Sequence, residues 1–346
     1  MRDPRSSSPI PARVLLLAAL VWAASPAPGQ DSSEKPRERK LSTAVGPAFA
    51  LGKAGARWAA LIAEMSAGKL VVRLFHGATL AQRDPAREFL ALRDGVADLA
   101  VGSSLYWSTQ VSELNAVGLP WLVGDVEALD ALTVGAMKAR FDAAIERAGG
   151  VALAYAALGH RDIATTAKPV RSPADTVGMK IRVASVPLLN DLFVALGASP
   201  RAMAFADAQT AFRERALDAQ EGTPATLAAA RVDALGVREV LLWGAVAEIA
   251  VFAASRVAWD AWTEPQRAIV RDAAQQAARE LPGLARAEDA AALAELRRRG
   301  VTITRLTAAG RGAFAATTRG VYDKWAVLAG PELVRDAETA VRGEPR

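Results

Sequence analysis

The chain contains no cysteine, so disulfide bonds and thiolate chemistry are excluded along all of its 346 residues. It has only two histidines, His76 and His160, which leave little for a histidine-based metal site. The sequence also lacks a Gly-x-Gly-x-x-Gly turn, a phosphate-binding P-loop and a Gly-x-Ser-x-Gly elbow. We therefore expect no catalytic residues, no metal and no cofactor.

A strong excess of charge of one sign is missing as well. The 42 basic and 37 acidic residues give a formal charge of +5. Removing the first 29 residues takes away three arginines and one aspartate and leaves +3. This balance does not favour nucleic acid as a partner. The content of 51% apolar and 23% charged residues is typical of a folded protein, and the length allows two domains.

Long hydrophobic runs are absent except for one near the N-terminus. Arg2, Arg5 and Arg13 precede an apolar run at residues 14–24, and small residues follow. This order is typical of a secretory signal peptide, and the run is shorter than the ~20 residues of a membrane-spanning helix. A buried N-terminal helix is the alternative.

The end of this segment predicts where the mature protein begins. Ala27 and Gly29 suit the −3 and −1 positions of a cleavage site, so we expect residues 1–29 to be removed. The polar residues 30–39 are expected to be a disordered lead-in. Charged residues interrupt every later apolar stretch, which predicts a soluble protein outside the cytoplasm.

Residues 178–224 carry the clearest pattern of secondary structure. We expect strands at 179–183, 202–204 and 216–221, with helices at 188–196 and 207–215 between them. A β-α-β-α-β run of this kind predicts a largely parallel sheet covered by helices. Ligands bind at the carboxyl ends of such strands, where Arg182 and residues 220–222 lie.

The rest of the chain continues the same alternation. Further strands are expected at 40–46, 70–75, 99–101, 151–158, 240–242, 247–254 and 301–304. Further helices are expected at 50–66, 84–92, 125–147, 225–236, 263–299 and 308–342, the fifth bent near Pro282. The pattern predicts two α/β lobes joined by at least two crossings of the chain. The second lobe is expected to have its own sheet. A dehydrogenase with separate cofactor and substrate domains would give a similar pattern.

Two arginines are the first candidates for a binding site. A guanidinium on an apolar strand, as at Arg182, needs an anionic partner or solvent, and its planar shape matches a carboxylate. The alternative for Arg182 is a structural salt bridge to the other lobe. Arg161 follows the strand at 151–158 and offers a second anion contact, or a solvated charge at a hinge.

Aromatic and acidic residues near strand ends are further candidates. Phe205 is placed to cover a ligand, and Tyr106 and Trp107 to form the opposite wall; core packing is the alternative for all three. Glu221 and Glu248 lie in apolar strands. Structural pairing with an arginine is the favoured interpretation for Glu221. For Glu248, the same choice between structural pairing and a role in the site applies.

A series of short motifs resembles one known family, the periplasmic solute-binding subunits of TRAP transporters (the DctP family). The resemblance covers residues 40–342. The motifs are, in order, GKLVV at 68–72, DGVAD at 94–98, LPWL at 119–122, GHR at 159–161, SPAD at 172–175, GMKIRV at 178–183, GASP at 197–200 with MAF at 203–205, and LDAQE at 217–221. Each motif alone is weak, but the ordered set is highly specific.

The resemblance implies a two-lobed periplasmic-binding-protein-like α/β fold with a long helix spanning both lobes. Lobe I is expected at 40–158 and 246–287, and lobe II at 159–245 and 288–342. It also implies a periplasmic protein that captures a small organic acid in the cleft. Delivery to the permease subunits then needs only peripheral, transient membrane contact.

By motif match, the resemblance assigns the residues of the cleft. Arg182 takes the place of the arginine that grips the ligand carboxylate, and Arg161 that of a second, less uniform arginine. The other positions implied as ligand contacts are Ser185, Phe205 and Gly222 in lobe II, and Ala44 and Ser103 in lobe I.

The chain departs from the family pattern at several of these positions. Gly222 replaces an asparagine, Thr223 a proline, and Ala184 the usual proline. Ala44 and Ser103 are small where polar or acidic residues often contact hydroxylated ligands, which favours a bulkier or more apolar acid than a sugar acid. Two other functions remain open: a sensor that presents its ligand to a receptor kinase, and a secreted enzyme.

Overall fold

The computed structural model describes residues 38–166, 168–203 and 205–343. The expected signal peptide and nearly all of the expected lead-in lie outside these ranges. The last residue of that lead-in, Arg39, is instead the first residue of a strand. Its guanidinium lies 3.2 Å from the Asp98 carboxylate, so the ordered fold begins slightly earlier than expected.

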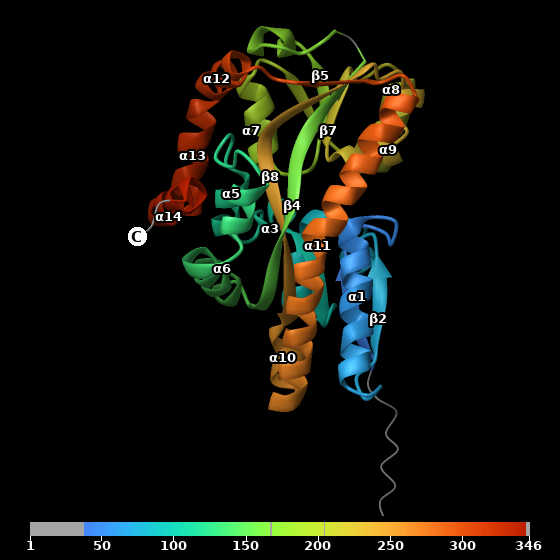
Figure 1. The fold of residues 1–346 in the computed structure, drawn as a ribbon, viewed down its shortest axis with the longest axis vertical. Helices are drawn as coiled ribbons and strands as arrows, with labels where there is room; N and C mark the ends of the chain where they lie inside the picture. Colours follow the sequence, from blue (N-terminus) through green and yellow to red (C-terminus); the bar gives the residue numbers. More distant parts are fainter. Residues whose placement is uncertain (1–37, 167, 204, 344–346) are drawn as a thin grey trace, which may run out of the picture. The chain divides into compact units, whose positions relative to one another are not determined.

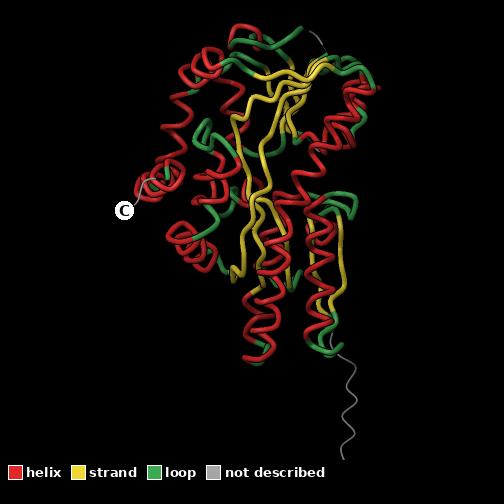
Figure 2. Tube along the Cα trace, viewed as in Figure 1, coloured by secondary structure: helices red, strands yellow, loops and turns green. Residues whose placement is uncertain are grey.

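The described strands form one nine-stranded sheet in the order β2-β1-β3-β8-β4-β7-β5-β6, with β9 pairing β8 (Figures 1 and 2). The strands are β1 (Arg39–Thr43), β2 (Val72–His76), β3 (Leu99–Ser103), β4 (Gly150–Thr165), β5 (Lys180–Val183), β6 (Ser199–Ala202), β7 (Ala219–Gly222), β8 (Glu239–Ser255) and β9 (Thr302–Arg305).

Helices cover the sheet on both sides. They are α1 (Ala50–Met65), α2 (Glu88–Arg93), α3 (Ser104–Trp107), α4 (Asn115–Gly118), α5 (Val126–Ala131), α6 (Gly135–Arg147), α7 (Pro187–Ala195), α8 (Phe205–Arg213), α9 (Pro224–Ala229), α10 (Arg256–Asp260), α11 (Glu264–Arg298), α12 (Ala308–Thr317), α13 (Arg319–Ala329) and α14 (Pro331–Arg342). None of the helices in the described ranges combines the length and apolar content that a membrane crossing requires.

The long strands β4 and β8 run through the middle of the molecule and join its two ends (Figure 1). Strands β1 and β3 are parallel to each other on the side of β8, and β5, β6 and β7 are parallel on the side of β4. The parallel arrangement expected for residues 178–224 is therefore confirmed. The expectation that the second lobe has its own sheet is wrong, because β4 pairs with both β7 and β8.

Several expected element boundaries are also wrong. The strands expected at 240–242 and 247–254 are one strand, β8, and β4 continues past residue 158 to Thr165. Glycines interrupt the apolar pattern at both places, but bulges absorb them and the hydrogen-bonded ladder continues. Gly159, whose φ is +135°, lies at one such shift of register. The strand expected at 202–204 lies earlier, as β6.

Three expected helices are divided in the same way. The helix at 125–147 is α5 and α6, which are separated where Gly135 takes a φ of +57°. The helix at 308–342 is α12, α13 and α14, with a break at Gly330 (φ +105°) before Pro331. In place of the helix expected at 225–236, the chain forms the shorter helix α9 and then a short 3₁₀ turn. Left-handed backbone stops helical hydrogen bonding, and glycine adopts it without strain.

The sheet separates two apolar cores because successive strand side chains point to opposite faces. In β8, Ile249 and Val251 belong to the core beneath α6, whereas Ala250 and Phe252 belong to the core beneath α1 and α11. Trp58 of α1 lies edge-on to Phe252, and its indole nitrogen donates to a carbonyl of α11 at 3.0 Å. The apolar face of α1 is therefore buried in this core.

The 35-residue helix α11 connects the two ends of the sheet. A capping box between Thr263 and Gln266 begins it, with Pro265 in its first turn. It packs against α1 at one end and α9 at the other, alongside β4. Figure 1 shows it changing direction partway, and Pro282 inside the helix removes a backbone donor. The expected long helix that spans both ends of the fold is confirmed.

Candidate functional site

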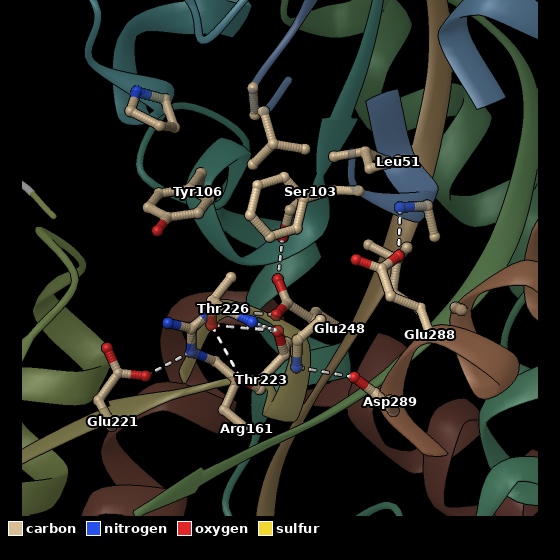
Figure 3. Close-up of a pocket in the computed structure, with 18 of the residues that line it drawn as sticks. Leu51, Ser103, Tyr106, Arg161, Glu221, Thr223, Thr226, Glu248, Glu288 and Asp289 are labelled. Carbon is tan, nitrogen blue, oxygen red and sulfur yellow. Dashed lines mark hydrogen bonds and ion pairs between the residues drawn. The ribbon is translucent and has the colours of Figure 1, made fainter. Parts of the chain in front are cut away.

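A cavity of about 300 Å³ lies where the carboxyl ends of β1, β3, β5 and β7 converge beside α11 (Figure 3). This is the position that parallel strands predict for a ligand. The described residues that line it are Ala44, Val45, Gly46, Phe49, Ala50, Leu51, Pro85, Ser103, Tyr106, Leu158, Arg161, Arg182, Gln220, Glu221, Thr223, Ala225, Thr226, Glu248, Ala285, Glu288 and Asp289.

Arg161 is the centre of a buried ionic network in the cavity wall. It lies in β4 next to β7 and β8, so its guanidinium meets acidic side chains from both neighbours. Its Nε donates to Oε2 of Glu221, and its Nη1 donates to Oε1 of Glu248 at 3.0 Å. Ser103 donates to the second oxygen of Glu248. Arg161 is therefore not the solvated hinge charge that was one alternative for it.

The surroundings fix the charge states of this network. Burial opposes ionisation of Glu221, but the charges of Arg161 and Arg182 outweigh it and lower the Glu221 pKa. Burial likewise disfavours the charged Arg161, yet Glu221 and Glu248 raise its pKa well above the usual value. Glu221 also accepts from the backbone N–H of Ala184 at 2.7 Å. Both groups are thus held ionised in the cavity wall.

Arg182 is held differently. Its Nε and Nη2 donate to the carbonyl oxygen of Met203 at 3.1 and 3.0 Å. Its Nη1 lies 3.8 Å from Oε1 of Glu221, beyond hydrogen-bond length, and has no hydrogen-bond acceptor in the described ranges. Because Arg182 lines the cavity, this nitrogen is a cationic donor available to an anion.

The remaining wall of the cavity is mostly apolar. Phe49 and Leu51 come from the start of α1, Leu158 from β4 and Ala285 from α11. Tyr106 faces them from α3, and burial raises the pKa of its hydroxyl, which stays neutral. Apolar walls and fixed charge together suit a ligand with one anionic group and an apolar body.

Five residues predicted from the sequence are brought together here: Arg182, Arg161, Tyr106, Ser103 and Ala44. The hydroxyl of Ser103 donates its hydrogen bond to Glu248. Trp107, in contrast, is in the core against Phe89, with ring centroids 5.2 Å apart.

Three other predicted residues are placed elsewhere or are only partly described. Ser185 is exposed and Gly222 is buried at the end of β7, and neither is among the cavity-lining residues. Phe205 begins α8, but its side chain lies outside the described part of the structure.

Sequence reasoning missed the residues of the α1 start and of α11. Glu288 accepts from the backbone N–H of Ala50, and Asp289 accepts from that of Ala225 at 3.2 Å. Burial raises the pKa of Asp289 to about 7, and burial also raises the pKa of Glu288. Two adjacent acids in an alanine-rich helix that crosses both lobes were the available signal. No group of three or more His, Cys, Asp or Glu residues in the described ranges is placed to hold a metal.

Comparison with known proteins identifies the family. Residues 41–327 match the model of the family described as "Bacterial extracellular solute-binding protein, family 7". The C4-dicarboxylate-binding periplasmic protein DctP of Rhodobacter capsulatus is 26% identical over 87% of this chain and 90% of that protein. The 2,3-diketo-L-gulonate-binding periplasmic protein YiaO of Escherichia coli is 30% identical over 46% of this chain. The chain spans about half the length of this protein and of the other first curated relatives it matches.

A solved structure is more similar. A TRAP periplasmic solute-binding protein from Ralstonia eutropha H16, with bound (S)-2-acetolactate, is 41% identical. The match has a TM-score of 0.85 and covers 89% of this chain and 99% of that one. This chain therefore belongs to the bacterial extracellular solute-binding proteins of family 7 and has the two-lobed α/β fold of TRAP periplasmic solute-binding proteins.

Proposed function

We propose that this protein is the extracytoplasmic solute-binding subunit of a TRAP transporter, which captures a small organic carboxylate between its lobes and delivers it to the membrane permease. The observation that carries this proposal is the free Nη1 of Arg182 at the cavity. Membership of family 7 and the bound acid of the Ralstonia eutropha relative support it.

The energetics indicate what each part of the site contributes. One charge-assisted hydrogen bond is worth about 1.5–3 kcal/mol net, whereas micromolar affinity needs about −8 kcal/mol. Arg182 thus sets the orientation and charge preference of the ligand. Closure over the apolar wall formed by Phe49, Leu51 and Leu158 supplies much of the rest.

The proposal includes the lobes and the route of export. Lobe I comprises residues 40–158 and 246–287, and lobe II comprises 159–245 and 288–342; β4, β8 and α11 cross between these ranges. Cleavage of residues 1–29 releases the mature chain into the periplasm. The contact with the permease is peripheral and transient.

The test is direct identification of the ligand. Mass spectrometry of small molecules released from the purified protein is expected to find an organic acid. A calorimetric titration panel should then include 2-hydroxy, 2-oxo and sugar acids, with uncharged alcohols of matched size as controls. Binding of the alcohols but of no acid is the result that contradicts the proposal.

A further inference from the structure

Two consecutive acids of α11, Glu288 and Asp289, line the cavity and join its two sides. Oε2 of Glu288 accepts from the N–H of Ala50 at the start of α1, and Oδ1 of Asp289 accepts from the N–H of Ala225 in α9. One oxygen of each carboxylate is therefore hydrogen-bonded to a backbone N–H group. The other two oxygens make no hydrogen bond with the described residues, so each can still accept one.

The negative charges of Glu288 and Asp289 are not paired with any described basic group, unlike those of the other acids in the cavity. Glu221 and Glu248 compensate Arg161 and Arg182, so that the inner network is neutral. Glu288 and Asp289 have no basic group within 4 Å in the described ranges. Lys53 lowers the pKa of Glu288 only as a longer-range charge. Burial raises the pKa of Asp289 to about 7, so above that pH the α11 pair is a surplus of negative charge.

The pair lies away from the cation that is available to a ligand. Figure 3 shows Glu221 on the left of the cavity and Glu288 and Asp289 on the right. Arg182 lies beside Glu221, 3.8 Å from it. A ligand carboxylate held by Arg182 therefore points the rest of the ligand towards the α11 pair.

We propose that Glu288 and Asp289 are specificity-determining residues, which restrict the site to monocarboxylates bearing a hydroxyl group and reject dicarboxylates. Their free oxygens accept a hydrogen bond from the hydroxyl, whereas a second ligand carboxylate directed at the pair meets two like charges. In a partly dehydrated cavity such repulsion is screened far less than in water. The inference rests on the proposed function and names the class of acid that is bound.

The test compares two acids of matched size by calorimetry. (S)-2-acetolactate and 2-hydroxy-2-methylmalonate differ in that a carboxylate replaces an acetyl group of nearly the same shape. At about pH 8.5, which is above the raised pKa of about 7 of Asp289, the wild-type protein is expected to bind acetolactate at least about tenfold more tightly than 2-hydroxy-2-methylmalonate.

Variants assign this preference to the α11 pair. Glu288→Gln and Asp289→Asn keep an oxygen for the backbone N–H and remove the charge. Each substitution is therefore expected to reduce the preference for acetolactate, measured as the ratio of the two dissociation constants, by at least about threefold. Asp272→Asn is the matched control, because Asp272 is exposed on the same helix and does not line the cavity. It is expected to leave the ratio unchanged.

The outcomes separate the two proposals. Equal wild-type affinity for the two acids overturns the inference alone, and this needs no variant to fold. Variants that weaken both acids equally, with an unchanged ratio, also overturn it, because the pair then only caps helices. Wild-type protein that binds neither of these acids nor any acid of the wider panel overturns the proposed function, and the inference with it.

Discussion

Nε of Arg161 donates to Oε2 of Glu221 in the wall of the cavity, and the two residues are only 5% and 1% exposed. The pair joins β4 to β7, and Glu221 reaches on to the backbone of Ala184 beyond β5. The donors of Arg161 are therefore largely satisfied within the protein. Nη2 of Arg161 and Nη1 of Arg182 make no hydrogen bond with the described residues, so each of these arginines has one nitrogen to offer a ligand.

The first prediction concerns Arg182. Arg182→Ala removes the free Nη1 donor, so the affinity for an organic carboxylate is expected to fall at least about tenfold, as the loss of one charged hydrogen bond requires. Calorimetric titration measures it. Arg201→Ala is the control, because Arg201 is exposed on the neighbouring strand β6 and does not line the cavity. Unchanged binding by Arg182→Ala would remove Arg182 from the site.

The second prediction concerns the stability of the buried network. Arg161→Leu leaves Glu221 and Glu248 without the cation they share. Loss of one partner from a buried ion pair lowers the free energy of unfolding by about 3–5 kcal/mol. Urea unfolding measures this loss. Arg57→Leu is the matched control, because the Arg57–Glu280 pair is on the surface and surface pairs contribute about 0–1 kcal/mol. Equal effects of the two substitutions would contradict the assignment.

The third prediction concerns pH. Burial raises the pKa of Asp162 to about 8, and the charge of Asp289 adds to this, while backbone N–H groups of Trp243 and Gly244 and the charge of Arg305 act against it. The unfolded chain has an ordinary carboxyl pKa near ~3.9. Between these two values the folded state binds more protons, so the contribution of Asp162 to stability falls as the pH rises from about 4 to about 8.

Asp162→Asn tests this dependence. The amide oxygen still accepts from the N–H of Trp243, whose nitrogen lies 3.1 Å from the carboxylate, but no charge forms. The variant is expected to have a Tm above that of the wild type by at least about 2 °C at about pH 9, with little gain at about pH 4. Calorimetry at both pH values measures it, with Asp272→Asn as an exposed control on α11. A gain of equal size at both values would contradict the burial argument.

The fourth prediction concerns the backbone where β4 passes from one lobe range to the next. Gly159 has a φ of +135°, which strains any residue with a Cβ, so Gly159→Ala is expected to destabilise the protein by about 1 kcal/mol or more. Gly312→Ala is the matched control: it lies in α12, with open space around its Cβ position, and is expected to be neutral or slightly stabilising. Urea unfolding of both variants measures the difference.

The sequence by itself determined the local elements and the end of the sheet that forms the site. Alternating apolar residues around Arg182 gave a strand, and the β-α-β order placed its carboxyl end at the cavity. The capping signals at Thr263 located the start of α11. Where glycines interrupted the pattern, as at Gly159 and Gly244, sequence reasoning ended strands that continue, because a bulge is stabilised by the partner strand and not by local propensity.

Only the tertiary structure decided how the charges are shared. Sequence spacing does not show that Glu221 and Glu248 converge on Arg161 from two different strands, 60 and 87 residues away. It also does not show that Glu288 and Asp289 meet the starts of α1 and α9. Such pairings depend on which strands and helices become neighbours, and that is set by burial of the apolar faces of the whole chain.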